Sequence, residues 1–167
     1  MTNDFSIVQY TPDQRDICVE LFQRVYSSPP FEFDWLDRDK ALKYFTDLEG
    51  TPGFFSFILS DGASIVGACM GQKEENFQNG GYKINEFFIE PEHQHIGLGS
   101  YFINELENHL RELGLKVIYL FTQRGMNSFD FYQKNDFISN DETVHMIRVI
   151  QQQPKVVYTR TFIKSDN

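Results

Sequence analysis

Residues 84–100 read INEFFIEPEHQHIGLGS, and this stretch decides the fold. It begins as an apolar run typical of a buried strand, which Pro91 ends, and it continues through a short loop into a helical pattern. Gly97 and Gly99 let the backbone approach an oxyanion closely, at a helix start whose first N–H groups have no partner within the helix. The stretch therefore predicts a strand, a phosphate-binding loop over residues 94–99 and a helix, although two glycines alone are equally compatible with a tight turn.

The loop differs from the two common nucleotide-binding loops. The third glycine of the dinucleotide pattern is missing, and no acidic residue ends the following strand. The chain also has no Gly-Lys-Ser/Thr sequence, which excludes the loop that binds nucleoside triphosphates. These absences leave a different phosphate-bearing cofactor as the expectation.

Working outward from the loop, the spacing of apolar residues predicts a mixed sheet with helices on its faces. We expect strands over residues 5–10, 54–59, 65–72, 82–89, 115–122, 144–150 and 156–163. We expect helices over residues 12–25, 38–48, 99–113 and 127–134, with apolar stripes that include Ile17 in the first and Leu113 in the third. The sequence thus predicts one α/β (α+β) domain over residues 1–167, with about seven strands and about four helices.

Composition narrows the class of function. The 167 residues carry a net charge of −9, which argues against nucleic acid as a partner and suits a cationic one, or solubility alone. No run approaches the roughly 18 apolar residues needed to cross a bilayer, and no signal peptide is recognisable, so we expect a cytoplasmic protein with no membrane partner. Cys18 and Cys69 lie far apart without metal-ligand spacing, so we expect neither a disulfide nor a metal site.

Two motifs resemble one known family. Residues 84–100 resemble the central motif of the GNAT N-acetyltransferase superfamily, Gln/Arg-x-x-Gly-x-Gly/Ala after an apolar strand. Residues 128–137, SFDFYQKNDF, resemble the family's Ala-x-x-x-Tyr-x-x-x-Gly-Phe segment, with Tyr132 at the tyrosine position. Asp136 replaces the glycine there, and Gly125 replaces an asparagine often found upstream. The order of elements also agrees, so the resemblance extends over nearly the whole chain.

The resemblance implies an acyltransferase that uses acetyl-CoA as co-substrate and needs no metal. It implies that the loop amides hold the CoA pyrophosphate and that the preceding strand pairs with the pantetheine arm. The residues expected to bind acetyl-CoA are Phe88, Ile89, Gln94, His95, Ile96, Gly97, Leu98, Gly99, Ser100 and Asn127.

Two residues are the candidates for catalysis. Glu86 would act as general base for the amine, since the family often has an acidic residue at this strand position; a strand glutamate facing solvent is the alternative. Tyr132 would act as general acid for the departing thiolate; a tyrosine that only packs in the core is the alternative.

The acceptor is expected at the connection between the first two helices, which forms a wall of the acceptor cleft in the family. Phe31, Glu32, Asp34 and Trp35 combine aromatic rings with carboxylates, which suits a polyamine or an aminosugar as well as a hydrophobic plug with solvated acids. The segment also resembles aminoglycoside 6'-N-acetyltransferases. The expected function is direct acetyl transfer to a primary amine of a small, cationic molecule. Acetylation of a peptide or protein, or a non-catalytic CoA-binding sensor, are the alternatives, and the family also allows a homodimer.

Overall fold

The computed structural model describes residues 5–27, 37–77 and 80–148 of the chain. They fall in two units, Met1–Phe137 and Ile138–Asn167. Every helix and strand of the described residues lies in the first unit. None of the described helices is long and apolar enough to cross a membrane.

The strands and helices of the first unit follow each other in the predicted order. Its strands are β1 (Ser6–Gln9), β2 (Phe57–Ser60), β3 (Ile65–Glu74), β4 (Gly81–Ile89) and β5 (Val117–Tyr119). Its helices are α1 (Arg15–Tyr26), α2 (Arg38–Glu49), α3 (Leu98–Glu112) and α4 (Asn127–Lys134), with single 3-10 turns η1 (Pro12–Gln14) and η2 (Pro91–His93). The predicted helices are therefore confirmed to within a few residues.

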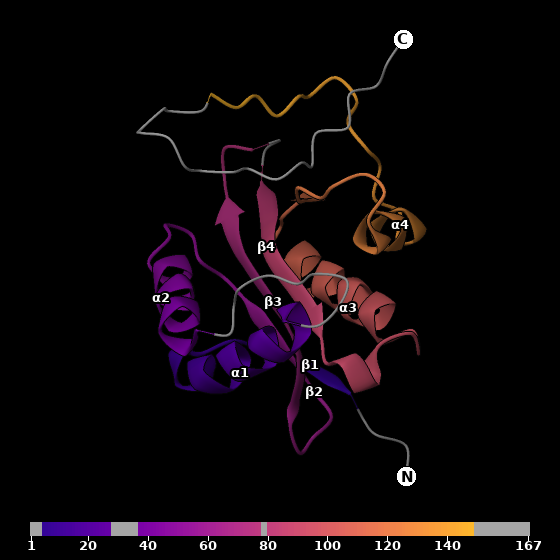
Figure 1. The fold of residues 1–167 in the computed structure, drawn as a ribbon. Coiled ribbons are helices and arrows are strands. Elements are labelled where there is room, and N and C mark those ends of the chain that lie inside the picture. The colour runs from indigo at the N-terminus through magenta and orange to yellow at the C-terminus, as the bar shows by residue number, and fades with distance from the viewer. Residues whose placement is uncertain (1–4, 28–36, 78–79, 149–167) are drawn as a thin grey trace. The chain divides into compact units, whose positions relative to one another are not determined.

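The strands form one mixed sheet in the order β1-β2-β3-β4-β5. Neighbours are antiparallel from β1 to β4, whereas β4 and β5 are parallel and are connected through α3. The predicted mixed α/β class is confirmed, with five strands among the described residues where about seven were expected (Figure 1).

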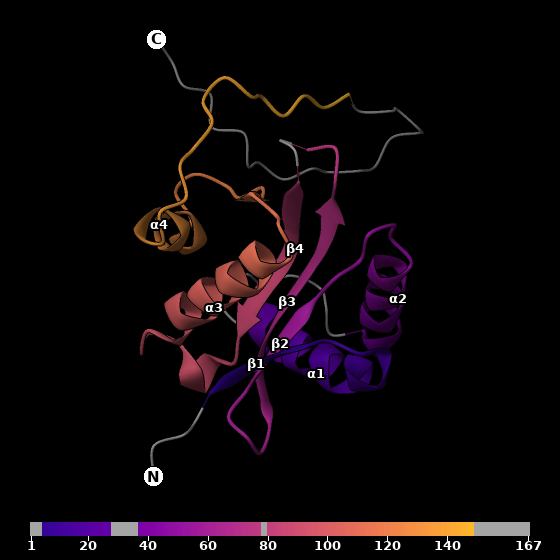
Figure 2. The ribbon, with the colours of Figure 1, turned by 180° about the vertical axis from the view of Figure 1, so that it is seen from behind.

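Helices cover both faces of the sheet. Helices α1 and α2 lie on one face, where Phe22 is the centre of a core that also contains Phe45, Met70 and Phe88. Helix α3 lies on the other face and is seen in front of the sheet in Figure 2. Its stripe packs on the second core through the buried side chains of Leu98, Phe102, Ile103, Leu106 and Leu110.

Two residues of the predicted apolar stripes do not face the core. Ile17 is 52% exposed and Leu113 is 55% exposed. On α1 the fully buried Cys18 faces the core instead, and on α3 the helix ends at Glu112 before Leu113 can turn inward. Gly114 takes a φ of 80° directly after that end, as its position in the sequence predicts.

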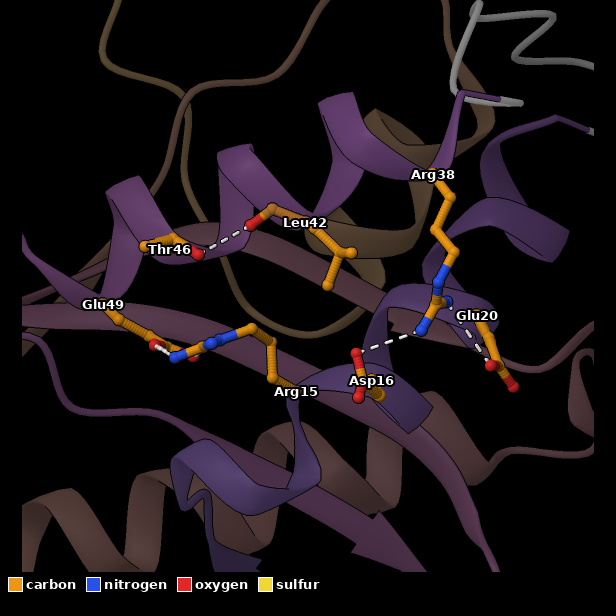
Figure 3. Close-up of polar contacts among 7 residues, drawn as sticks. All are labelled: Arg15, Asp16, Glu20, Arg38, Leu42, Thr46 and Glu49. Carbon is orange, nitrogen blue, oxygen red and sulfur yellow. Dashed lines mark hydrogen bonds and ion pairs between the residues drawn. The ribbon is translucent and has the colours of Figure 1, made fainter.

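Ion pairs hold α1 against α2 (Figure 3). Arg15 at the beginning of α1 pairs with Glu49 at the end of α2, through both carboxylate oxygens. Arg38 at the beginning of α2 reaches Asp16 at 3.0 Å and Glu20 at 3.4 Å on α1. These contacts fix the relative position of the two helices that cover Glu86.

Strand β4 contains a bulge and loses its neighbour halfway along. Met70 of β3 pairs with Glu86, but the next residue, Gly71, pairs with Ile84, so Asn85 is an extra residue in β4. On the other side, β5 pairs only with residues 81–83 of β4. Within the described residues, the β5-facing edge of β4 therefore has no strand partner from Ile84 onward.

Strand bounds differ from the prediction more than helix bounds do. Phe54 forms only an isolated bridge to Gln72, so β2 begins later than expected. Strand β5 covers three half-buried residues of the predicted run 115–122, because its ladder with β4 includes only residues 81–83 of that strand. In the second unit, residues 144–148 form no strand; the rest of the predicted strand 144–150, and all of 156–163, lie outside the described residues.

Candidate active site

The loop between β4 and α3 has the geometry of an anion cradle. Gly97 precedes α3 with a φ of 87°, and His95 also has a positive φ, of 63°. The Gln94 side chain donates to the Ile89 carbonyl over 2.8 Å and ties the loop to the end of β4. The first helical bond runs from Tyr101 N–H to the Gly97 carbonyl, so the preceding N–H groups of α3 are available to an external acceptor.

Glycine is required at residues 97 and 99 for two different physical reasons. A Cβ on Gly97 would meet no atom within 4 Å, so that glycine is needed for its φ and leaves open space above the loop. A Cβ on Gly99 would lie 3.0 Å from the Phe131 ring, so that glycine lets α4 approach α3 closely. The tight-turn alternative thus explains Gly97 in part, and close packing explains Gly99.

The side chains around the cradle are used mainly by the fold. Leu98 and Ile89 are buried in the core on the α3 face, and Phe88 is buried against α1. Ile96 is 67% exposed, and Asn127 is exposed at the beginning of α4. Contacts to a ligand at this loop would therefore come chiefly from backbone N–H groups.

We expect Gly97→Ala to raise the KM for acetyl-CoA about tenfold, because its Cβ enters the space above the loop. The matched control is Gly62→Ala, since Gly62 has a φ of 88° and a Cβ added there would likewise meet no atom within 4 Å. Each substitution should cost about 1–2 kcal/mol of stability through the same left-handed strain. Equal KM values for the two variants would contradict a role of the loop in binding acetyl-CoA.

Glu86 lies on the α1/α2 face of β4, the same face as Phe88. Its Oε1 accepts a hydrogen bond of 2.5 Å from the Tyr44 hydroxyl of α2, and the Tyr26 hydroxyl of α1 donates to the same carboxylate. Burial raises the pKa of Glu86 above its ordinary range, and the two hydrogen bonds only partly offset this effect. Glu86 is therefore a desolvated carboxylate and not a strand glutamate that faces solvent.

Tyr26 and Tyr44 contact the candidate base Glu86, and the sequence analysis did not predict them as part of the candidate site. The hydrogen bond from Tyr44 connects residues 42 positions apart, and no local spacing predicts it. Burial, followed by the charge of Glu86, raises the pKa of both tyrosines, so each hydroxyl stays protonated and remains a donor. The one indication in the sequence was that Tyr26 directly precedes the connection predicted to line the acceptor cleft, whereas Tyr44 lies well inside α2.

Tyr132 of α4 lies close enough to Glu86 to sense its charge. Burial raises the pKa of Tyr132, and the nearby Cys69 thiol and Glu86 carboxylate raise it further. Its ring packs against Phe87, Phe131 and Phe137. Its hydroxyl has no hydrogen-bond partner among residues 5–27, 37–77 and 80–148, so it is a protonated donor that remains available to a ligand.

Residues 19–137 match the model of the Acetyltransferase (GNAT) family. The chain belongs to the GNAT acetyltransferase family. It is therefore an acetyltransferase, and GNAT enzymes use acetyl-CoA. No curated protein matches the chain in sequence.

Solved GNAT structures share the fold at low identity. A possible acetyltransferase from Clostridium difficile 630 aligns with a TM-score of 0.72 and 16% identity, over 88% of this chain and 99% of that one. The aminoglycoside acetyltransferase meta-AAC0020, from an uncultured soil metagenomic sample and in complex with sisomicin, aligns with a TM-score of 0.66 and 17% identity. The alignment covers 89% of this chain and 98% of that one. AAC(6')-Iy, in complex with the bisubstrate analog CoA-S-monomethyl-acetylneamine, aligns with a TM-score of 0.66 and 14% identity. The alignment covers 87% of this chain and 99% of that one.

The GNAT match ends at Phe137, which is the last residue of the second motif. Asp136, which replaces the family's glycine, takes a φ of 64°, and the Phe137 N–H bonds back to the Tyr132 carbonyl. This is the left-handed ending that aspartate tolerates. The departure from the GNAT pattern at residue 136 is thus accommodated without displacing Tyr132.

Two further features of the GNAT domain concern the Cys69 thiol and the predicted acceptor residues. Cys69 is fully buried, and burial raises its pKa to about 12, so it is an inert core thiol. The predicted acceptor residues Phe31, Glu32, Asp34 and Trp35 lie outside the described residues.

Proposed function

We propose that this GNAT protein transfers the acetyl group of acetyl-CoA directly to a primary amine of a small cationic molecule. The observation that carries the proposal is the Glu86 carboxylate, which is desolvated, hydrogen-bonded by Tyr44 and close to Tyr132. These are the two kinds of group that amine acetylation needs, a proton acceptor and a proton donor.

The chemistry demands a base because the acceptor is protonated in water. An amine with a pKa of about 10.4 is only about 0.04% neutral at pH 7, which corresponds to roughly 4.6 kcal/mol. A carboxylate with a raised pKa is a better proton acceptor than an exposed one. Glu86 therefore suits the removal of a proton from an ammonium group, directly or through a water molecule.

Charge pairing also favours a cationic acceptor. Two other carboxylates of the unit with restricted exposure have arginine partners: Glu49 pairs with Arg15, and Glu90 pairs with Arg24. Glu86 has no cationic partner among residues 5–27, 37–77 and 80–148 and is bonded only by tyrosine hydroxyls. Because a desolvated charge is costly without a counter-charge, an ammonium group is the complementary ligand.

The loop over residues 94–99 fits the pyrophosphate of the co-substrate. Its support is the positive φ of Gly97, the open space where a Cβ would lie, and the N–H groups at the start of α3. The unpaired edge of β4 suits the amide groups of the pantetheine arm. Bound acetyl-CoA would supply an activated carbonyl and a thiolate leaving group, and we infer that the Tyr132 hydroxyl donates its proton to the departing sulfur.

The nature of the acceptor is supported by fold-level similarity. The sisomicin complex and the CoA–acetylneamine analog complex both involve aminoglycosides, which carry several amines. The net charge of −9 agrees with an acceptor of that kind. We therefore infer a polyamine or aminosugar and rank a peptide second.

A thiol-release assay with acetyl-CoA tests this function. We expect turnover with spermine and with sisomicin, at kcat/KM values well above those for a peptide with a free N-terminus. A preference for the peptide would contradict the small-molecule acceptor. Tight binding of acetyl-CoA with no turnover on any amine would contradict the enzyme and favour a sensor.

A further inference from the structure

A strip of polar side chains continues from Glu86 along the same face of the sheet. Asn85 Nδ2 donates to Gln72 Oε1 over 3.1 Å, and Gln72 Nε2 donates to Glu74 Oε1 over 2.8 Å. The Tyr119 hydroxyl of β5 donates to the other oxygen of Glu74. We call these four residues the polar strip; Gln72 and Glu74 follow Met70, the partner of Glu86, at alternate positions of β3, which places them on the face of Glu86.

Glu74 resembles Glu86 in one feature of its hydrogen bonding. Each carboxylate accepts a hydrogen bond from a tyrosine hydroxyl, and neither pairs with a cation among the described residues. Arg15 and Arg24, by contrast, pair with Glu49 and Glu90. Glu74 uses one bond at each oxygen, so it retains the capacity to accept further donors.

Neither neighbouring lysine forms an ion pair with Glu74 among the described residues. The Lys83 ammonium lies over the Phe121 ring, 5.8 Å from its centroid. The Lys73 ammonium lies over the Phe55 ring at 4.2 Å, and Phe55 packs on the core of the opposite face. Both ammonium groups lie over aromatic rings, and neither forms an ion pair with Glu74, which leaves Glu74 without a cationic partner in the part of the chain that the structure describes.

Aromatic rings flank the strip where a cation would approach. Tyr119 stacks on Phe77 with 4.2 Å between ring centroids, and Phe121 is 76% exposed beside Tyr119. Aromatic faces attract ammonium groups, and they also cover apolar carbon chains. The end of the strip therefore combines a carboxylate with exposed rings, as a site for an organic ammonium requires.

We propose that the polar strip is a second subsite, in which Glu74 binds a remote ammonium group of the acceptor while another amine lies at Glu86. This proposal rests on the proposed function, and it deepens that function by requiring an acceptor with at least two amines. Met70 pairs with Glu86 and lies four residues before Glu74, so the two carboxylates are anchored roughly 13 Å apart along the strand. A long polyamine or an aminosugar of several rings spans that distance, and a short diamine does not.

Glu74→Gln tests the subsite, with Glu75→Gln as the matched control because Glu75 is the adjacent residue in the chain. With spermine, we expect Glu74→Gln to raise KM about tenfold and to leave kcat nearly unchanged, since the amide keeps the shape but loses the charge. With hexylamine, which has no second ammonium, KM should be the same in both variants and in the wild type.

The two acceptors separate the possible failures. Equal spermine KM values for Glu74→Gln and Glu75→Gln, or an equal rise for spermine and hexylamine, would overturn the subsite. Absence of turnover with either amine in the wild type would instead overturn the proposed function. Should Glu74→Gln unfold, Tyr119→Phe gives a second measurement, because it removes one donor to Glu74 and should raise the spermine KM alone.

Discussion

Glu86→Gln is expected to lower kcat for amine acetylation by about 10²–10⁴-fold, the range that a general base contributes. The amide keeps the size of the side chain and can still accept the hydrogen bond from Tyr44, but it cannot take a proton. The measurement is thiol release at saturating acetyl-CoA with spermine as acceptor. Unchanged turnover would show that another group, or water alone, deprotonates the amine.

The pH dependence gives an independent test of Glu86. Its pKa is raised by burial, so the base is lost as the pH falls through that raised value, and kcat/KM of the wild type should decline on the acid side within that window. Glu86→Gln should lack this limb. A wild-type profile without an acid limb above the ordinary range of a glutamate would contradict the assignment.

Stability separates this chemical effect from unfolding. A carboxyl whose pKa is raised by folding stabilises the protein while it is protonated, and that contribution is lost as the pH rises above about 4.3, the ordinary value. At neutral pH the wild type therefore bears the cost of a desolvated charge. Glu86→Gln should melt at a temperature equal to or above that of the wild type.

Tyr132→Phe is expected to lower kcat by about 10²-fold, with the KM for acetyl-CoA unchanged. The variant retains the ring that packs on Phe87, Phe131 and Phe137 and loses only the hydroxyl that would donate to the thiolate. Steady-state kinetics with acetyl-CoA varied at a fixed amine concentration measure both quantities.

Tyr101→Phe is the control for Tyr132→Phe. The Tyr101 hydroxyl bonds to the Phe5 carbonyl at the beginning of β1, away from Glu86, so its loss should leave kcat unchanged. Full turnover in Tyr132→Phe would mean that Tyr132 serves only the packing of α4. A fall in both variants would point to a general loss of structure.

Local chemistry explains why the helices were predictable. Asp37 caps α2 by accepting from the N–H groups of Asp39 and Lys40, and Pro12 opens the turn before α1. Each effect involves only residues that are close together in the chain, so it can be predicted from the sequence. The same holds for Gly97, whose positive φ follows from its place before α3.

Strand ends and side-chain partners depend on residues far apart in the chain. The bulge at Asn85 and the short ladder between β4 and β5 arise from pairing in three dimensions. The strand predicted from the sequence was therefore longer than β5 is in the structure. The same limit applied to the site. Glu86 and Tyr132 were proposed from motifs, whereas Tyr26 and Tyr44 reach Glu86 only because α1 and α2 pack on the sheet.

The close approach of Phe131 to Gly99 constrains how related sequences can vary. A methyl group at residue 99 would displace the Phe131 ring, which is stacked on Phe87 with 5.8 Å between centroids. Residues 87, 99 and 131 therefore form a set in which a larger residue at one position requires a smaller one at another. Libraries of variants made to accept new amines should vary the three positions jointly, since most single substitutions there would disturb the packing of the other two residues.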